Sequence, residues 1–240
     1  HQRFAAEPGS VETGAQLVLA LAKGDRRAEA ELMVARLRQI PGRVADPLID
    51  YVEATVAGSG AEPQRALVLF SRALERAIAA GRGDLVSQAR ASRGRLLSTL
   101  GRGDEARSDM EAARAGFETS GDTASLARVL NDLSIEELQR GNLLAGERLL
   151  EQALAASRAA GPGGGGVILG NLAGIAMQRG RPDLAEPRHR EAVEIFRQAK
   201  SRRLSWALTD LSETLRELGR VAEADAALAE AQVHRLLSER

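Results

Sequence analysis

The stretch that decides the fold is residues 130–154, which reads LNDLSIEELQRGNLLAGERLLEQAL. Apolar side chains before Gly141 recur on one helical face, and small or apolar residues after it recur at steps of four, three and four. The first set is Leu126, Val129, Leu130, Leu133 and Leu138, and the second is Gly146, Leu150, Ala153 and Ser157. This pattern predicts two amphipathic helices joined by a tight glycine turn.

The same layout repeats along the chain. Four successive turn glycines are separated by 40, 39 and 39 residues. They are Gly101, Gly141, Gly180 and Gly219, and Gly24 and Gly60 precede them in similar contexts. A fixed period of this size is the sequence signature of a repeat architecture, so internal repetition is the main organising feature of the chain.

The repetition predicts twelve helices in six hairpins. The expected helices span residues 12–22, 26–39, 47–57, 62–80, 84–99, 103–119, 123–140, 143–159, 167–179, 183–199, 202–218 and 221–238. A single hairpin cannot bury both of its apolar faces, so neighbouring hairpins must stack into a continuous superhelix. We expect the first helix of each pair to line the concave surface of that stack.

Composition narrows the function classes. The 240 residues include 33 basic and 33 acidic side chains, and this balance gives no basic stripe for a nucleic acid. Cysteine is absent, which excludes disulfides and thiolate metal sites, and the apolar stretches are too short to span a membrane. We expect a cytoplasmic protein, although a chain without cysteine suits the periplasm equally.

The sequence gives no support for an enzyme, a metal site or a cofactor site. His1, His189 and His234 are too scattered for a metal cluster, and His189 is expected to be a packed core imidazole. The glycine-rich run at 161–166 lacks the Lys and Ser or Thr that close a phosphate-binding loop. We interpret that run as a junction that shortens the next helix, because glycine is costly inside helices.

Three segments carry a resemblance to a known family. They are residues 130–154, residues 169–193 (LGNLAGIAMQRGRPDLAEPRHREAV) and residues 208–231 (LTDLSETLRELGRVAEADAALAEA). Their pattern of Leu, small, Gly, Ala and Ala positions resembles the tetratricopeptide repeat. The resemblance implies an all-α fold, a right-handed superhelix or α-solenoid of about six helical hairpins. It predicts an N-terminal tail or the end of a preceding element at 1–11, degenerate hairpins at 12–81 and four repeats at 82–240.

In this family, polar residues of the first helix reach the concave face, including one about nine positions before the turn glycine. The positions that match are Ser92, Asp132, Asn171 and Asp210, and the neighbouring candidates are Arg95, Arg128, Asn131, Trp206, Thr209 and Glu213. Asn and Asp side chains can pair with the backbone of an extended peptide. Asp132 and Asp210 stand where a clamp for a terminal carboxylate needs neutral or basic residues, so a basic ligand is expected.

Structural roles compete with these assignments. Asp132, Asn171 and Asp210 could instead hydrogen-bond neighbouring helices, since most polar contacts in proteins are structural or solvated. A lone tryptophan such as Trp206 is usually packed. Both interpretations stay open at the level of the sequence.

The resemblance implies a protein- or peptide-binding scaffold, or the sensory domain of a larger bacterial regulator. The longer period and the Arg- and Ala-rich repeats are similar to arrays that follow kinase or winged-helix domains. One alternative is a receptor for a small signalling peptide. Another is a self-association module, in which terminal repeats pair between chains as a homodimer. No nucleic-acid, membrane or cofactor partner is expected for this segment.

Overall fold

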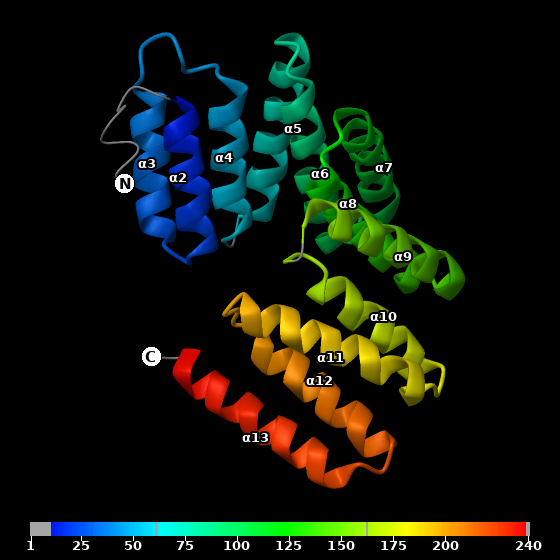
Figure 1. The fold of residues 1–240 in the computed structure, drawn as a ribbon. Coiled ribbons are helices and arrows are strands. Elements are labelled where there is room, and N and C mark those ends of the chain that lie inside the picture. Colours follow the sequence, from blue (N-terminus) through cyan, green and yellow to red (C-terminus); the bar gives the residue numbers. More distant parts are fainter. Residues whose placement is uncertain (1–10, 61, 162, 239–240) are drawn as a thin grey trace. The chain divides into compact units, whose positions relative to one another are not determined.

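The computed structural model describes residues 11–60, 62–161 and 163–238, and these residues form twelve α-helices and no strand (Figure 1). In chain order the helices are α2 (Val11–Lys23), α3 (Arg27–Arg38), α4 (Pro47–Gly58), α5 (Pro63–Ala79), α6 (Gly83–Thr99), α7 (Gly103–Ser120), α8 (Thr123–Gln139), α9 (Leu143–Ala160), α10 (Gly166–Gln178), α11 (Pro182–Gln198), α12 (Leu204–Glu217) and α13 (Val221–Ser238). The predicted all-α class and helical-hairpin architecture are confirmed. Of the predicted N-terminal tail, residues 1–10 lie outside the described residues.

Every predicted helix boundary lies within two residues of the observed one. The turn glycines explain this agreement, because they adopt the left-handed conformation that ends a helix and that other residues resist. Gly101, Gly141, Gly180 and Gly219 have φ values of 73°, 80°, 67° and 73°. Pro187 lies inside α11 without ending it.

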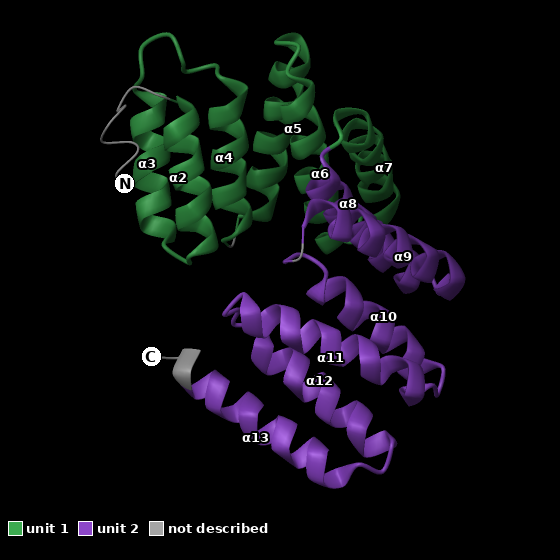
Figure 2. Ribbon diagram, in the orientation of Figure 1, with its two compact units in different colours: residues 1–121 green, residues 122–240 purple. Residues whose placement is uncertain are grey.

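The chain divides into two compact units, residues 1–121 and residues 122–240 (Figure 2). In the first, the described helices are the hairpins α2–α3, α4–α5 and α6–α7, and in the second they are α8–α9, α10–α11 and α12–α13. Successive hairpins within a unit pack together, as α5 on α6 and α11 on α12 show. The predicted boundary between degenerate hairpins (12–81) and four repeats (82–240) is based on sequence pattern. The division into compact units does not test it, so it stays a prediction.

Small residues set the spacing within each hairpin. Gly146 opens α9 beneath the end of α8, and a Cβ atom there would lie 2.7 Å from the Leu138 side chain. Ala106, Ala185 and Ala224 occupy the equivalent position in their hairpins and are fully buried. The small-residue signature in the sequence therefore reflects close packing of the two helices in a hairpin.

The first unit contains a buried ionic cluster around Asp50 on α4. The Asp50 side chain is 0% exposed, and its carboxylate accepts hydrogen bonds from three guanidinium groups. The donor–acceptor distances are 2.5 Å to Arg38, 2.8 Å to Arg72 and 2.7 Å to Arg76. These contacts join α3, α4 and α5, and they satisfy a charge that would otherwise be costly to bury.

The glycine-rich junction has the predicted effect on the following helix. Helix α10 begins at Gly166 and has 13 residues, whereas α8 has 17. A Cβ atom on Gly166 would lie 2.7 Å from the ring of Phe196, so the start of α10 packs directly against that ring. Residue 162 lies outside the described part of the chain.

Candidate functional site

A polar pair links the first helices of two neighbouring hairpins in the second unit. The Asn171 Nδ2 atom on α10 donates to Asn131 Oδ1 on α8 at 2.9 Å. The first unit has an equivalent pair, in which the hydroxyl oxygens of Tyr51 on α4 and Ser92 on α6 are 3.3 Å apart. Tyr51 and Ser92 each lie nine residues before a turn glycine and so occupy the same repeat position, whereas Asn171, nine before Gly180, meets Asn131, ten before Gly141.

A pocket of about 230 Å³ lies next to the Asn131–Asn171 pair, between α10, α11 and α12. Asn171 lines it from α10, and Trp206 and Asp210 line it from α12. Trp206 is 64% exposed, so the expectation of a packed tryptophan is wrong. The remaining lining residues are Gly166, Val167, Gly170, His189, Ala192, Phe196, Arg203 and Ala207.

Asp210 supplies a carboxylate that has no partner in the part of the chain that the structure describes. Its backbone carbonyl oxygen accepts a hydrogen bond from the Thr214 hydroxyl at 3.0 Å, but no donor reaches its side chain. Desolvation by the surrounding protein and then repulsion from the Glu213 carboxylate raise the pKa of Asp210 above its ordinary value. Asp210 is therefore an exposed, partly desolvated acid whose side chain accepts no hydrogen bond from the described residues.

His189 on α11 lines the pocket as a neutral group. It is 4% exposed, and its Nδ1 atom lies 2.8 Å from Thr214 Oγ1. The one hydroxyl hydrogen of Thr214 goes to the Asp210 carbonyl oxygen, so we assign Nδ1 of His189 as the donor to Thr214. Burial lowers the pKa of His189 to about 4, so the ring carries no charge at neutral pH. The prediction of a packed imidazole is confirmed.

The other predicted groove residues have varied surroundings. Arg128 donates to the Ser125 hydroxyl at 2.7 Å, and the Thr209 hydroxyl donates to the Ser205 carbonyl oxygen at 2.9 Å. Glu213 is exposed beside Asp210, and Asp132 is half-buried on α8. Ser92 and Arg95 belong to the first unit. The pocket thus brings together Asn171, Trp206 and Asp210, and whether any predicted residue contacts a ligand stays a prediction.

Sequence reasoning missed part of this pocket. Gly170 was not predicted, because we associated glycine with turns, whereas it lies inside α10 with open space where a Cβ atom would be. Arg203 was missed because it directly precedes α12, outside the repeat pattern. The spacing of Arg203, Trp206 and Asp210, at steps of three and four, was the available signal for a shared helix face.

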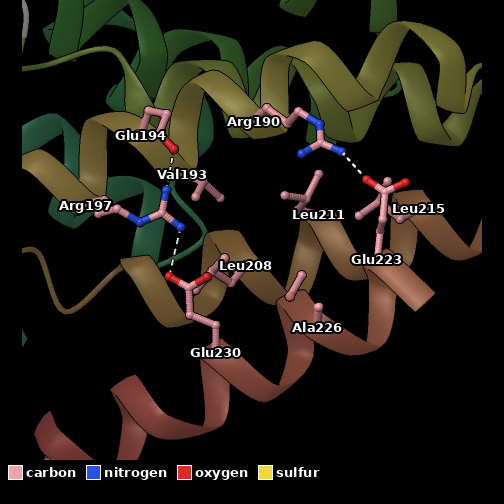
Figure 3. A pocket seen from close by; sticks show the side chains of 11 residues that line it. Arg190, Val193, Glu194, Arg197, Leu208, Leu211, Leu215, Glu223, Ala226 and Glu230 are labelled. Atoms are coloured by element: carbon pink, nitrogen blue, oxygen red, sulfur yellow. Dashed lines mark hydrogen bonds and ion pairs between the residues drawn. The ribbon is translucent and has the colours of Figure 1, made fainter. Parts of the chain in front are cut away.

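A second pocket, of about 390 Å³, is lined by α11, α12 and α13 (Figure 3). Val193, Leu208, Leu211 and Leu215 provide apolar lining, and two ion pairs connect α11 with α13. Arg190 pairs with Glu223 at 2.9 Å and Arg197 pairs with Glu230 at 2.8 Å. The charged groups at this pocket pair with one another, so the pocket at Asp210 is the better candidate for binding a charged ligand.

Two further classes of site were considered. Among the residues that the structure describes, no three or more His, Asp or Glu side chains gather as a metal site would require. None of the helices in residues 11–60, 62–161 and 163–238 combines the length and apolarity needed to cross a membrane.

Comparison with known proteins agrees with the hairpin architecture. The sequence profile of the tetratricopeptide repeat family matches residues 166–232, which cover the last two hairpins. Comparison with curated protein sequences finds no significant match.

Several solved structures share the fold at low sequence identity. BtubC (BKLC) from P. vanneervenii has a TM-score of 0.67 at 20% identity, covering 96% of this chain and 92% of that one. The protein pilF of Pseudomonas aeruginosa has a TM-score of 0.67 at 16% identity, covering 94% and 90%. The complex of NprR with its cognate peptide NprX has a TM-score of 0.66 at 11% identity, covering 96% and 70%.

These findings identify the class of protein. The chain is an array of tetratricopeptide-type helical hairpins, an α-solenoid fold. Its match to the family profile is confined to α10–α13, the region that contains both pockets described above.

Proposed function

We propose that the chain is a protein- or peptide-binding module whose binding site is the pocket between α10, α11 and α12. The observation that carries this proposal is the unpaired Asp210 carboxylate beside the exposed Trp206 ring. A large exposed aromatic and a partly desolvated, unpaired charge both reduce the stability of the free protein. A bound partner would bury the ring and pair the charge.

The row of asparagines extends this site. Asn131 and Asn171 are half-buried, and the one hydrogen bond between them leaves each amide with further donors and acceptors. An extended peptide has an unpaired backbone N–H and C=O at each residue, and these amides could pair with it. Tetratricopeptide arrays are scaffolds for protein and peptide partners, which agrees with this chemistry.

The finer role that we propose is the sensory or scaffolding part of a bacterial regulator, with a small signalling peptide as one ligand class. The likeness to the quorum sensor NprR supports the proposal, since that protein was crystallised with its cognate peptide. At 10–11% identity this likeness establishes a shared fold, so the ligand must be determined for this chain.

The proposal can be tested by selecting binders from a random dodecapeptide library displayed on phage. The selected peptides would then be titrated against wild type and two variants of α10, Gly170→Leu and Gly174→Leu. Both positions have open space where a Cβ atom would be, so both variants should fold. Only Gly170 lines the pocket, and a leucine there would occupy it.

We expect peptides that bind wild type and Gly174→Leu but bind Gly170→Leu at least tenfold more weakly. Equal binding to all three proteins would place the peptide site elsewhere on the array. A library that yields no binder would contradict peptide recognition by this chain.

Self-association is a second candidate function, and a feature of α13 favours it. An exposed stripe of apolar side chains runs along α13 at alternating steps of four and three, the spacing at which two helices pack along a seam. Its members are Ala222, Ala226, Ala229, Val233 and Leu236. The occupant of this stripe in our proposal is the same helix of a second copy of the chain.

Sedimentation equilibrium of wild type and the Val233→Glu, Leu236→Glu double variant tests this candidate. Val233 and Leu236 are 55% and 64% exposed, so charges there should leave folding intact. We expect a wild-type dimer that the double variant converts to a monomer, while Val68→Glu on α5 remains dimeric. A monomeric wild type at 100 µM, a concentration on the order of that used for weak dimers, would contradict the candidate.

A further inference from the structure

Three side chains, one directly before α12 and two on it, share one helical face and line the same pocket. Arg203, Trp206 and Asp210 follow one another at steps of three and four, so they lie one above the other along the helix. Arg203 and Asp210 are about 10 Å apart along the axis, because each residue advances an α-helix by about 1.5 Å. Trp206 lies between the two opposite charges, and neither charge pairs with the other.

We infer that the Trp206 and Asp210 end of this pocket binds the cationic side chain of a peptide, with arginine as the preferred residue. This inference rests on the proposed function and specifies which part of the ligand the pocket recognises. A planar guanidinium can donate two hydrogen bonds to the Asp210 carboxylate and stack on the exposed indole.

The local charges favour a cation at this end. Glu213 is close enough to Asp210 to repel it, and His189, the other titratable group at this depth, is neutral. Several other acidic side chains of the second unit already have arginine partners. Glu223 pairs with Arg190 and Arg220, at 2.9 and 2.6 Å. Asp210 is an acid of the same unit whose pairing capacity remains for a ligand.

The size of the pocket favours a single side chain over a small molecule. Its volume of about 230 Å³ is below the ~300–1,000 Å³ that is typical of small-molecule sites. A long side chain would lay its methylene groups along Trp206 while its charged end reaches Asp210. On the facing helix, the bare backbone at Gly170 would let the peptide main chain approach Asn171.

Arg203 could orient a ligand that carries an acidic group. A ligand with an acidic group close to its arginine could place that group near Arg203, at the other end of the same helix face. A capped peptide whose only charged side chain is one arginine gains nothing from Arg203, and its cation is repelled weakly across ~10 Å of solvent-exposed surface. Removing the Arg203 charge should therefore leave binding of such a peptide unchanged or slightly tighter.

The test uses four acetylated and amidated heptapeptides that differ only at the central residue, which is arginine, lysine, citrulline or glutamate between alanines and glycines. Citrulline has nearly the shape of arginine without its charge. Each peptide would be titrated into the full chain, with Trp206 emission as the signal, since it is the single tryptophan in the sequence. Calorimetry would provide the affinity of variants that lack the indole.

We expect the arginine peptide to bind at least tenfold more tightly than the citrulline peptide, with lysine between them and glutamate undetectable. Asp210→Asn should abolish the difference between arginine and citrulline, and Trp206→Ala should weaken arginine binding several-fold. Asp225→Asn, which changes an exposed acid on α13 that is paired with Arg216 outside the pocket, should retain the difference. Retention of the wild-type difference by Asp210→Asn would overturn the inference.

The proposed function and this inference can fail separately. The display selection could yield peptides that bind at the Gly170 pocket but show no preference for arginine and bind Asp210→Asn as tightly as wild type. That result would support peptide recognition and contradict the cationic pocket. The absence of any peptide binder would reject both.

Discussion

Asn171 on α10 donates a hydrogen bond to Asn131 on α8 at 2.9 Å, and this contact joins the first helices of two successive hairpins. In the first unit the position equivalent to Asn171 is occupied by Tyr51 and by Ser92, whose hydroxyl oxygens are 3.3 Å apart. These two contacts thus help to hold neighbouring hairpins in register. At Asp210, one repeat beyond Asn171, the position carries a charge, and its side chain pairs with no described residue.

If Asp210 serves binding at a cost to stability, replacing it should make the protein more stable. Asp210→Asn removes a carboxylate that desolvation and Glu213 both disfavour, so we expect it to stabilise the second unit at pH 7. The gain should be a few tenths of a kcal/mol, since the residue is exposed and solvent screens it. The raised pKa means that the folded state holds the proton more tightly than the unfolded state does. The gain should therefore shrink as the pH falls and the wild-type carboxyl becomes protonated.

Urea unfolding of both proteins at several pH values, followed by Trp206 emission, measures this difference. A matched substitution at an acid with arginine partners, Glu223→Gln, should instead lower stability or leave it unchanged. Destabilisation by Asp210→Asn at pH 7 would mean that the carboxylate has a structural partner.

The glycines of α10 should respond oppositely to alanine substitution. Gly170 and Gly174 have open space where a Cβ atom would be, so Gly170→Ala and Gly174→Ala should each stabilise by about 0.5–1 kcal/mol. At Gly166 the added atom would lie 2.7 Å from the Phe196 ring, so Gly166→Ala should destabilise by about 1–3 kcal/mol. Thermal unfolding, followed by circular dichroism, shows whether each of the three substitutions raises or lowers stability. Stabilisation by Gly166→Ala would show that the Phe196 ring can move aside.

The sequence predicted the backbone far better than the site, and particular residues show why. A left-handed turn at Gly141 or Gly219 is a local property, so the helix ends follow from single residues. Asn131 and Asp132 are neighbours whose side chains point about 100° apart on a helix, and only the packed structure shows that Asn131 meets Asn171. The cluster at Asp50 was also unpredicted, because its arginines come from two other helices.

His189 predicts an acid sensitivity of the second unit. The ring takes up a proton near pH 6.5 in the unfolded chain, but its buried folded-state pKa is about 4. The unfolded state therefore binds more protons between these values, and stability is lost as the pH falls from 6.5 towards 4. The loss should reach about 3 kcal/mol, since each pH unit between the two pKa values is worth about 1.4 kcal/mol.

His189→Gln keeps a donor for Thr214 but does not titrate, so its stability should fall less than that of wild type over the same range. The measurement is the free energy of unfolding from urea titrations at half-unit pH steps, with Trp206 emission as the signal. His234→Gln, a half-buried position near the end of α13, controls for the loss of a histidine as such. Parallel curves for wild type and His189→Gln would contradict the burial of a neutral ring.

The Asp50 cluster predicts a large effect in the first unit. Asp50→Asn removes the charge that three arginines share and weakens hydrogen bonds that join α3, α4 and α5. Removing one partner of a buried ion pair lowers the free energy of unfolding by about 3–5 kcal/mol. We expect about 2–3 kcal/mol here, because Arg38, Arg72 and Arg76 are partly exposed and can be solvated.

Circular dichroism in urea measures this loss over the whole chain, while Trp206 emission reports on the second unit, where the single tryptophan lies. Glu29→Gln, which breaks an exposed pair with Arg26, should leave stability nearly unchanged, because solvent screens that pair. If Asp50→Asn cost no more than Glu29→Gln, the arginines would be stabilised by water rather than by Asp50. Since Asp50 is 0% exposed and its three arginine partners come from two other helices, we expect the two variants to differ several-fold.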